Sequence, residues 1–323
     1  MIKTSLYRPF GKCNLYYGEK FIHRRGQFEQ IFPTSEHQNV LICVSSVGSF
    51  KGLSVLITNS IPDLHLAGDT QCFPLYWYEE NKNLQKTLFD EVNEDKYIRR
   101  DGITDWILKE IRNRFGNTRV LSKEHIFYYV YGLLHSTQYR ERFASDLKKS
   151  LPRIPIVDTV EDFMAFYQAG KKLADLHLNY EHIAAYSGVN VVYGVPLKQE
   201  SYIDDETGEV VSKTGTFKDF IVEKMRFPQK GQRNTIIYNG NIRIENIPDK
   251  AYEYVVNGKS AIEWIMERYQ VSINKDSKIQ NNPNDWSIEH NKPRYILDLL
   301  LSVINVSIQT VDIVNGLPNL KVD

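Results

Sequence analysis

The sequence predicts an α+β protein of two lobes, built from small mixed β-sheets and helices. Three observations lead to this prediction. Short β-branched runs dominate residues 1–80, a nearly continuous helical stretch follows over residues 122–149, and strand-like runs return after residue 189. We therefore expect β-rich and helical parts to be interleaved, with a helical connecting segment between the lobes and a buried helix near the C-terminus.

Residues 1–120 are expected to form the first, β-rich lobe. Its strand-like runs lie at residues 40–44, 54–58 and 73–78. Glycines separate the first two runs, as expected for buried strands joined by a turn. Thr104 can cap a helix over residues 105–115, which ends before Gly116.

Residues 121–188 are expected to form the helical connecting segment. A helical stretch over residues 122–149 is stopped by the two prolines that follow it. Thr159 then resembles the N-cap of a further helix over residues 160–177. The apolar residues of this helix lie mostly near one face, which indicates core packing.

Residues 189–323 are expected to form the second lobe. The clearest hairpin spans residues 235–245, because Asn239-Gly240 suits a type I′ turn. Another turn is expected at residues 205–208. Helices are expected at residues 249–256, 261–269 and 293–314. The last helix is apolar around most of its circumference, so it should be buried by its own lobe or by a partner.

The charge balance limits what the chain can bind. Its 40 Lys and Arg residues equal its 40 Asp and Glu residues, so the formal net charge is zero. A small autonomous DNA-binding domain usually carries excess positive charge. Any nucleic-acid surface on this chain must therefore be a local patch.

The cysteines and the hydropathy indicate a cytoplasmic protein. Three widely separated cysteines without a CxxC pair predict neither structural zinc nor a disulfide framework. The N-terminus lacks the apolar run of a signal peptide, and the longest apolar stretch is too short and too polar at its edges to span a bilayer. We expect no membrane partner.

No motif predicts a catalytic centre. Gly258-Lys259-Ser260 resembles the end of a phosphate-binding loop, but the glycine required five residues earlier is Glu253. Ser260 and Glu263 instead suit a capping box for the next helix. The eight histidines include no HExxH pair, the acid–lysine pairs lack the spacing or setting of a metal-dependent nuclease, and the Asn/Asp-Pro-Pro-Tyr/Phe loop of an adenine methyltransferase does not occur. We expect no metal site.

What remains is chemistry suited to recognition. Residues 213–233 hold six cations, and the hairpin that follows presents two asparagines and an arginine: Lys213, Lys218, Lys224, Arg226, Lys230, Arg233, Asn239, Asn241 and Arg243. Phosphates bind cations, and base edges in the major groove bind Arg, Lys, Asn or Gln. The pattern indicates a DNA-binding surface, and a solvated charged loop is the alternative.

A second group of cations lies near the N-terminus. Its members are Arg8, Lys12, Lys20, Arg24 and Arg25, and three tyrosines accompany them. Cations beside aromatic residues can bind nucleic acid. An ordinary surface above core aromatic residues is the alternative interpretation of this group.

Residues 126–155 (IFYYVYGLLHSTQYRERFASDLKKSLPRIP) combine two short predicted helices with an exit bracketed by prolines. This stretch resembles the segment that joins the two lobes of the C-terminal specificity region in type ISP restriction-modification enzymes. Further blocks resemble the same family in the same order, at residues 7–10, 31–34, 58–63, 72–76, 222–231 and 254–269. The resemblance extends over nearly the whole chain.

The resemblance implies one part of a larger enzyme. In such proteins a nuclease, a translocating ATPase and an adenine methyltransferase precede this region, so the chain is expected to be non-catalytic by itself and to need no cofactor. The parent enzyme is expected to use S-adenosylmethionine, ATP and Mg. The family implies that this module and the methyltransferase domain hold double-stranded DNA together while the target adenine is flipped. Arg153 is a further expected DNA contact, and the module is expected to be monomeric.

The resemblance thus implies that the chain recognises a DNA sequence and directs methylation, translocation and cleavage, which other domains perform. Two other functions stay open. The chain could be an unrecognised metal-dependent nuclease. It could also be a scaffold that docks on the methyltransferase domain through the apolar C-terminal helix and has little contact with DNA.

Overall fold

The computed structural model describes the chain apart from residues 1, 19, 21, 23–25, 50, 82–95, 117–119, 204–209 and 323, and apart from the side chains of residues 200–213. The chain forms two compact units. Unit 1 comprises Met1–Leu178, Val256–Gly258 and Asp312–Asp323, and unit 2 comprises Asn179–Val255 and Lys259–Val311. Residues 121–178, expected as part of a connecting segment, belong to the same unit as the N-terminal strands.

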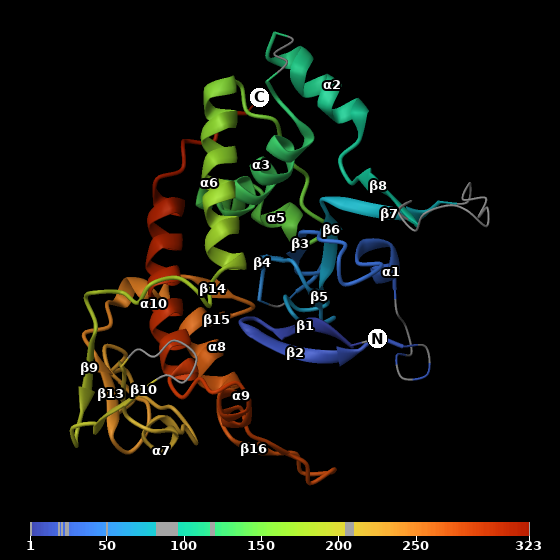
Figure 1. The fold of residues 1–323 in the computed structure, drawn as a ribbon. Coiled ribbons are helices and arrows are strands. Elements are labelled where there is room, and N and C mark those ends of the chain that lie inside the picture. Colours follow the sequence, from blue (N-terminus) through green and yellow to red (C-terminus); the bar gives the residue numbers. More distant parts are fainter. Residues whose placement is uncertain are drawn as a thin grey trace, which may run out of the picture. The chain divides into compact units, whose positions relative to one another are not determined.

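Unit 1 contains small sheets of mixed or antiparallel strands (Figure 1). β1 (Ile2–Arg8) pairs antiparallel with β2 (Gly11–Tyr16) and parallel with β5 (Ile61–Pro62), while β3 (Leu41–Val44) lies between β4 (Val55–Thr58) and β6 (Gln71–Pro74). Every residue of β3 and β4 is buried, as the β-branched runs predicted. These two strands form part of the core of unit 1.

The strand-like run at residues 73–78 is divided, which corrects the expectation of one strand. It contributes the end of β6 and the start of β7 (Tyr76–Glu80), and β7 pairs with β8 (Tyr97–Asp101) in a separate sheet. The buried Asn39 side chain holds the second part in place. Its Oδ1 accepts the Tyr76 N–H at 3.1 Å, and its Nδ2 donates to the Tyr76 carbonyl at 2.6 Å.

The helices of unit 1 are α1 (Phe28–Ile31), α2 (Asp105–Arg114), α3 (Lys123–His135), α4 (Thr137–Arg142), α5 (Ala144–Leu147) and α6 (Val160–Leu178). The expected caps form, since Thr104 and Thr159 each accept the backbone N–H three residues further on, at 3.3 and 3.1 Å. α3 packs along α6 (Figure 1), and the ring of Tyr129 stacks on that of Phe163 with centroids 4.3 Å apart.

Buried tyrosines fix the proline-bracketed exit from the helical stretch. Tyr129 donates its hydroxyl to the Pro155 carbonyl at 2.7 Å, and Tyr139 donates to the Arg153 carbonyl at 2.8 Å. Both rings lie in the core of unit 1. The side chain of Arg153 stays exposed. The aromatic residues of this stretch are therefore structural.

The remaining strands are β9 (Asn190–Tyr193), β10 (Gln199–Ile203), β11 (Val210–Thr214), β12 (Ile236–Ile237), β13 (Ile242–Glu245), β14 (Val255–Val256), β15 (Lys259–Ser260), β16 (Ser272–Ile273) and β17 (Gln280–Asn281). The remaining helices are α7 (Phe217–Phe220), the 3-10 turn η1 (Asp249–Tyr252), α8 (Ala261–Arg268), α9 (Asn284–Glu289) and α10 (Tyr295–Asn315). In unit 2, β12, β13 and β9 form an antiparallel sheet. The turn expected at residues 205–208 lies outside the described residues, between the paired strands β10 and β11.

The β12–β13 hairpin forms as predicted, but its turn differs from the expected type I′. Type I′ requires positive φ at both central residues, and neither Asn239 nor Gly240 has it. Asn239 Oδ1 instead accepts the N–H groups of Asn241 and Ile242, at 2.9 and 2.8 Å. The Asn239 side chain thus closes the turn together with the backbone, since the Ile242 carbonyl accepts the N–H groups of Tyr238 and Asn239 at 3.0 and 3.3 Å.

The helix expected at residues 249–256 is wrong beyond its first turn. Only η1 is helical, and β14 follows it. Burial alternates with period two over residues 252–256, which is the pattern of a strand. The capping box predicted next is confirmed: Glu263 accepts the Ser260 N–H at 3.0 Å, and Ser260 Oγ accepts the Glu263 N–H at 3.3 Å.

The C-terminal helix α10 is buried, as expected. It is long and apolar enough to cross a membrane, but 72% of its most apolar window is buried inside the protein. This is the pattern of a core helix. The scaffold alternative needed an uncovered apolar face on this helix, and the chain itself already covers most of that face.

Candidate nucleic-acid interface

Two of the expected cations share one face of the β9–β13–β12 sheet in unit 2. Arg226 forms a bridge with Ile237 through backbone hydrogen bonds of 3.0 and 2.9 Å, and Ile237 lies opposite Arg243 in the hairpin. Directly opposed residues of antiparallel strands point to the same face. Arg226 and Arg243 therefore flank Ile237 on one face, about 10 Å apart by the usual strand spacing.

This face is open to solvent. Both arginines are exposed, and Val192, opposite Arg243 on β9, is 39% exposed. The alternate residues on the other face, Ile242 and Ile244, are fully buried. Among the residues that the structure describes, neither guanidinium group has an acidic partner. We call the row Arg226–Ile237–Arg243 the arginine row.

Lys224 lies two residues before the arginine row and opens onto a hollow of about 480 Å³. The intervening Met225 is buried, so Lys224 and Arg226 are both left at the surface. The hollow is lined by Ile221, Glu223, Lys224, Val271, Gln280, Asn282, Asn284 and Ile288. Its lining thus combines one cation and one acid with three amide side chains, and we call it the amide hollow.

The three amides of the hollow are not equivalent. Asn284 is buried and structural, because its Oδ1 accepts the Val222 N–H at 3.0 Å and its Nδ2 donates to the Val222 carbonyl at 2.9 Å. Asn282 Oδ1 accepts a hydrogen bond from Asn284 Nδ2 at 2.8 Å, and Asn282 Nδ2 donates one to Asp285 Oδ1 at 2.6 Å. Gln280 is exposed, and its amide has no hydrogen-bond partner within the described part of the chain. Only Gln280 keeps its full capacity for a ligand.

Three expected contacts have internal partners instead. Asn239 Nδ2 donates to the Asp219 carbonyl at 2.9 Å, and Asn241 bonds both the N–H and the carbonyl of Val195, at 2.6 and 3.1 Å. Arg233 pairs with Glu263 at 2.8 Å and lies over the Tyr252 ring. These side chains hold unit 2 together, and their expected contact with DNA stays a prediction.

The structure places the other expected residues in different surroundings. Lys218 on α7 and Lys230 are exposed in unit 2. Lys12 is exposed in unit 1, whereas Arg8 pairs with Asp63 and lies over the Tyr7 ring. Arg24 and Arg25 and the side chain of Lys213 lie outside the described residues. Of the expected cations, three lie together on one surface of unit 2, at the arginine row: Lys224, Arg226 and Arg243.

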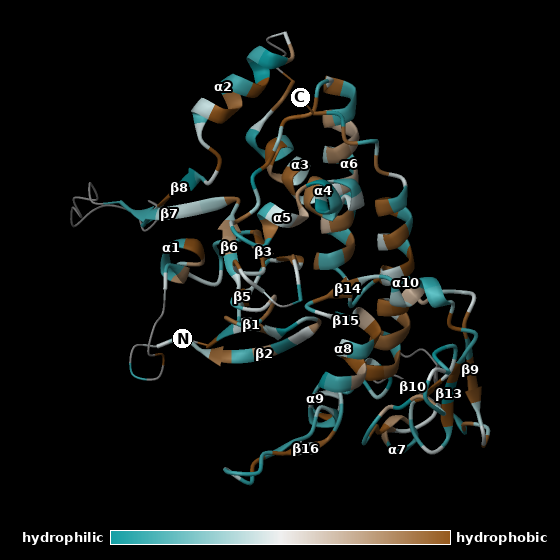
Figure 2. Cartoon of the chain, turned by 180° about the vertical axis from the view of Figure 1, so that it is seen from behind, coloured by the Kyte–Doolittle hydropathy of each residue, from teal (hydrophilic) through white to brown (hydrophobic). Residues whose placement is uncertain are grey.

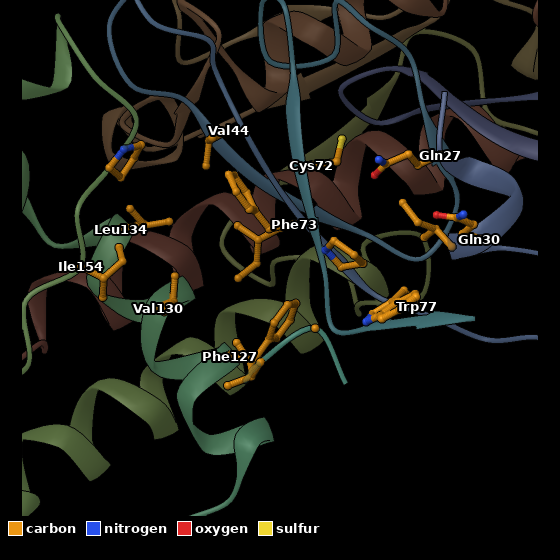
Figure 3. Close-up of a pocket in the computed structure, with 16 residues that line it drawn as sticks. Gln27, Gln30, Val44, Cys72, Phe73, Trp77, Phe127, Val130, Leu134 and Ile154 are labelled. Atoms are coloured by element: carbon orange, nitrogen blue, oxygen red, sulfur yellow. The ribbon is translucent and has the colours of Figure 1, made fainter. Parts of the chain in front are cut away.

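Unit 1 has a larger, apolar cavity of about 500 Å³ beside β6 and α3 (Figure 3). Phe73, Val130, Leu134 and Ile154 lie around it, with Gln27 and Gln30 among its few polar side chains. Cys72 is the single titratable residue of its lining. The cavity therefore offers no acid–base pair for catalysis.

Several ionisable groups of the packed interior have displaced pKa values. Burial raises the pKa of Tyr128 and of Tyr139 to about 12, and burial lowers that of His177 to about 3. Among the described residues, no group of three His, Cys, Asp or Glu could hold a metal ion. Desolvation in the core accounts for these shifts, so they do not mark a reaction centre.

The fold and these surfaces define a two-unit α+β module whose exposed cations and amides suit binding. A family model described as the Type ISP C-terminal specificity domain matches residues 1–299. The chain belongs to this family. No curated protein matches the sequence significantly.

Similar solved structures cover the chain almost entirely. The ATP-dependent Type ISP restriction-modification enzyme LlaBIII bound to DNA is 37% identical over 100% of this chain and 18% of its own, with a TM-score of 0.81. A nuclease-deletion mutant of the Type ISP enzyme LlaGI with a DNA substrate mimic is 36% identical over 100% of this chain and 25% of its own, with a TM-score of 0.77. A DrdV–DNA complex is 30% identical over 99% of this chain and 28% of its own, with a TM-score of 0.77. The chain spans between 18% and 28% of the length of these proteins.

The hairpin β16–β17 is a feature that the sequence reasoning missed. All residues from 272 to 281 are exposed, and the hairpin carries Lys275 and Lys278. The signal was present as two short runs around the polar turn NKDSK, with isoleucines on both sides. Each strand is only two residues long, and so short a strand shows no alternation of polar and apolar residues in the sequence.

Proposed function

We propose that this chain is the target-recognition module of a Type ISP restriction-modification enzyme and binds duplex DNA sequence-specifically. The observation that carries the proposal is the arginine row, two exposed guanidinium groups on one sheet face with Lys224 two residues away. The DNA held by the similar enzymes supports the same function. Cations at this spacing can contact successive phosphates, while amides beside them can read base edges.

The remaining steps of the reaction are assigned to other domains of a parent polypeptide. We propose that this module is non-catalytic, monomeric and cytoplasmic, and that it acts beside an adenine methyltransferase domain. S-adenosylmethionine, ATP and Mg would bind to those other domains. The family membership supports this division of labour, because a specificity domain chooses the site at which other domains act.

The test is the salt dependence of binding to a random-sequence duplex. Each phosphate neutralised contributes about 0.9 to the slope of log K against log salt. The triple variant Lys224→Ala, Arg226→Ala, Arg243→Ala should therefore lower the slope by up to about 2.7 and weaken binding at every salt concentration. Fluorescence anisotropy of a labelled duplex measures both quantities.

A matched control removes three exposed lysines of unit 1, as Lys109→Ala, Lys172→Ala, Lys321→Ala. This variant loses the same charge but should keep most of the affinity of the parent chain. If the two triple variants bind equally, general electrostatics and not the arginine row drives binding. If the parent chain and both variants bind equally, the proposed surface is wrong.

A further inference from the structure

The hairpin β16–β17 of unit 2 buries none of its own residues. Every residue from 272 to 281 is exposed, including Ile273 at 61% and Ile279 at 69%. It extends away from the rest of unit 2 in both views of the ribbon, and Figure 2 shows hydrophobic colour within this otherwise mostly hydrophilic arm. An isolated two-stranded hairpin is marginally stable, so its shape needs another source.

That source is the turn. Asn274 Oδ1 accepts the N–H groups of Asp276 and Ser277 at 3.0 and 2.9 Å, and the Asn274 N–H donates to the Ile279 carbonyl at 2.9 Å. Lys278 takes a left-handed φ of 58°, which turns the chain back. Backbone hydrogen bonds and the side chains of Asn274 and Ser277 thus shape the turn, since Ser277 Oγ also accepts the Ile279 N–H at 3.3 Å.

The base of the hairpin is continuous with the amide hollow. The Val271 N–H donates to the Glu223 carbonyl at 2.8 Å, which joins the start of β16 to the segment that carries Lys224. Gln280 of β17 lines the hollow together with Lys224. The hairpin and the hollow therefore form one connected surface of unit 2.

The chemistry of this surface fits duplex DNA. Lys275 and Lys278 at the turn outweigh Asp276, which gives the exposed end a net positive charge. A two-stranded β-ribbon has the width that the major groove admits. The Gln280 amide offers one donor and one acceptor side by side, and adenine presents the complementary pair, N7 and N6–H₂, in that groove.

We propose that the β16–β17 hairpin enters the major groove, where Lys275 and Lys278 contact phosphates and Gln280 reads an adenine. This inference rests on the proposed function, because it names the element through which DNA is read. It assigns affinity to the two lysines and specificity to the glutamine. The two roles predict different results when the residues are changed.

The experiment selects bound duplexes from a randomised pool and sequences them, using the full chain and two variants. Lys275→Ala with Lys278→Ala should lower the salt slope by up to about 1.8 and weaken binding to all sequences, with the selected motif unchanged. Gln280→Ala should keep the affinity for the random pool but lose about tenfold preference for adenine at one position of the motif. Gln229→Ala, another exposed glutamine of unit 2, is the matched control and should behave like the parent chain.

Because these side chains are exposed, thermal unfolding should be unchanged in all of these variants. If both hairpin variants select and bind like the parent chain while the Lys224, Arg226 and Arg243 variant loses binding, the hairpin inference is wrong and the proposed function stands. A chain that binds no duplex at all contradicts both. If the hairpin variants instead lose only their binding to a separately purified methyltransferase domain, the hairpin is a protein contact and the inference is overturned.

Discussion

Two buried histidines of unit 1 are neutral, and their burial makes stability depend on pH. His177 accepts or donates a 2.6 Å hydrogen bond with the Tyr131 hydroxyl, and the His135 ring lies 5.6 Å from the His177 ring. Desolvation lowers the pKa of His177 to about 3 and that of His135 well below its ordinary 6.5. The Nε2 atom of His135 finds no hydrogen-bond partner within the described part of the chain.

Acidification should therefore destabilise the protein through these residues. In the unfolded chain each imidazole takes up a proton near pH 6.5, whereas the folded state keeps it neutral, so the stability present above pH 6.5 is lost as pH falls toward 3. From pH 7 to pH 5 the expected loss is about 2 kcal/mol for His177, and His135 adds a loss in the same direction. Urea unfolding at the two pH values should show a smaller loss for His135→Leu than for the parent chain.

Carboxylates titrate in the same range, but they contribute equally to both proteins. A pH dependence identical in the parent chain and His135→Leu would show that burial does not lower the pKa of His135.

At the scale of elements, the contact of α3 with α6 depends on two facing glycines. A Cβ atom on Gly170 would lie 1.9 Å from the Tyr128 carbonyl oxygen, and one on Gly132 would lie 2.2 Å from the Phe166 carbonyl oxygen. Backbone atoms cannot rotate away as a flexible side chain can. The two helices therefore approach so closely because neither carries a side chain at the crossing.

Gly170→Ala should destabilise unit 1 by about 3 kcal/mol, because the added methyl group forces the helices apart. The midpoint of urea unfolding measures the change. Gln168→Ala, at an exposed position of the same helix, should stay within about 0.5 kcal/mol of the parent chain. Equal midpoints for the two variants would mean that α3 and α6 can move apart without a loss of unfolding free energy.

At the scale of the whole molecule, residues near the C-terminus complete the core of unit 1. Leu320 and Val322 are buried among residues of α3 and α6. The Leu320 N–H donates to Gln138 Oε1 at 2.7 Å, and the Lys321 carbonyl accepts the Asp158 N–H at 3.2 Å. Segments more than 160 residues apart in sequence thus close one unit.

Leu320→Ala combined with Val322→Ala should cost about 3 kcal/mol of unfolding free energy, because two buried side chains are truncated. Thermal unfolding should show a lowered midpoint. The neighbouring Lys321 is exposed, and Lys321→Ala should change stability by less than about 0.5 kcal/mol. A double variant as stable as the lysine variant would show that this segment contributes no packing energy.

The sequence by itself determined the features that depend on near neighbours. Thr104, Thr159 and Ser260 were predictable caps because a cap needs only a side-chain oxygen and an N–H three residues away. The buried strands β3 and β4 were predictable because β-branched runs report burial directly. The family resemblance was also present in the sequence, as blocks in a fixed order.

Only the tertiary structure decided which polar residues are available to a ligand. Asn239 and Asn241 look like base-reading residues, yet distant carbonyls and N–H groups occupy their amides. Gln280 was not singled out from the sequence, yet its amide is exposed at the edge of the amide hollow. The physical reason is that an amide binds whichever partner the fold brings within about 3 Å, and sequence distance does not specify that partner.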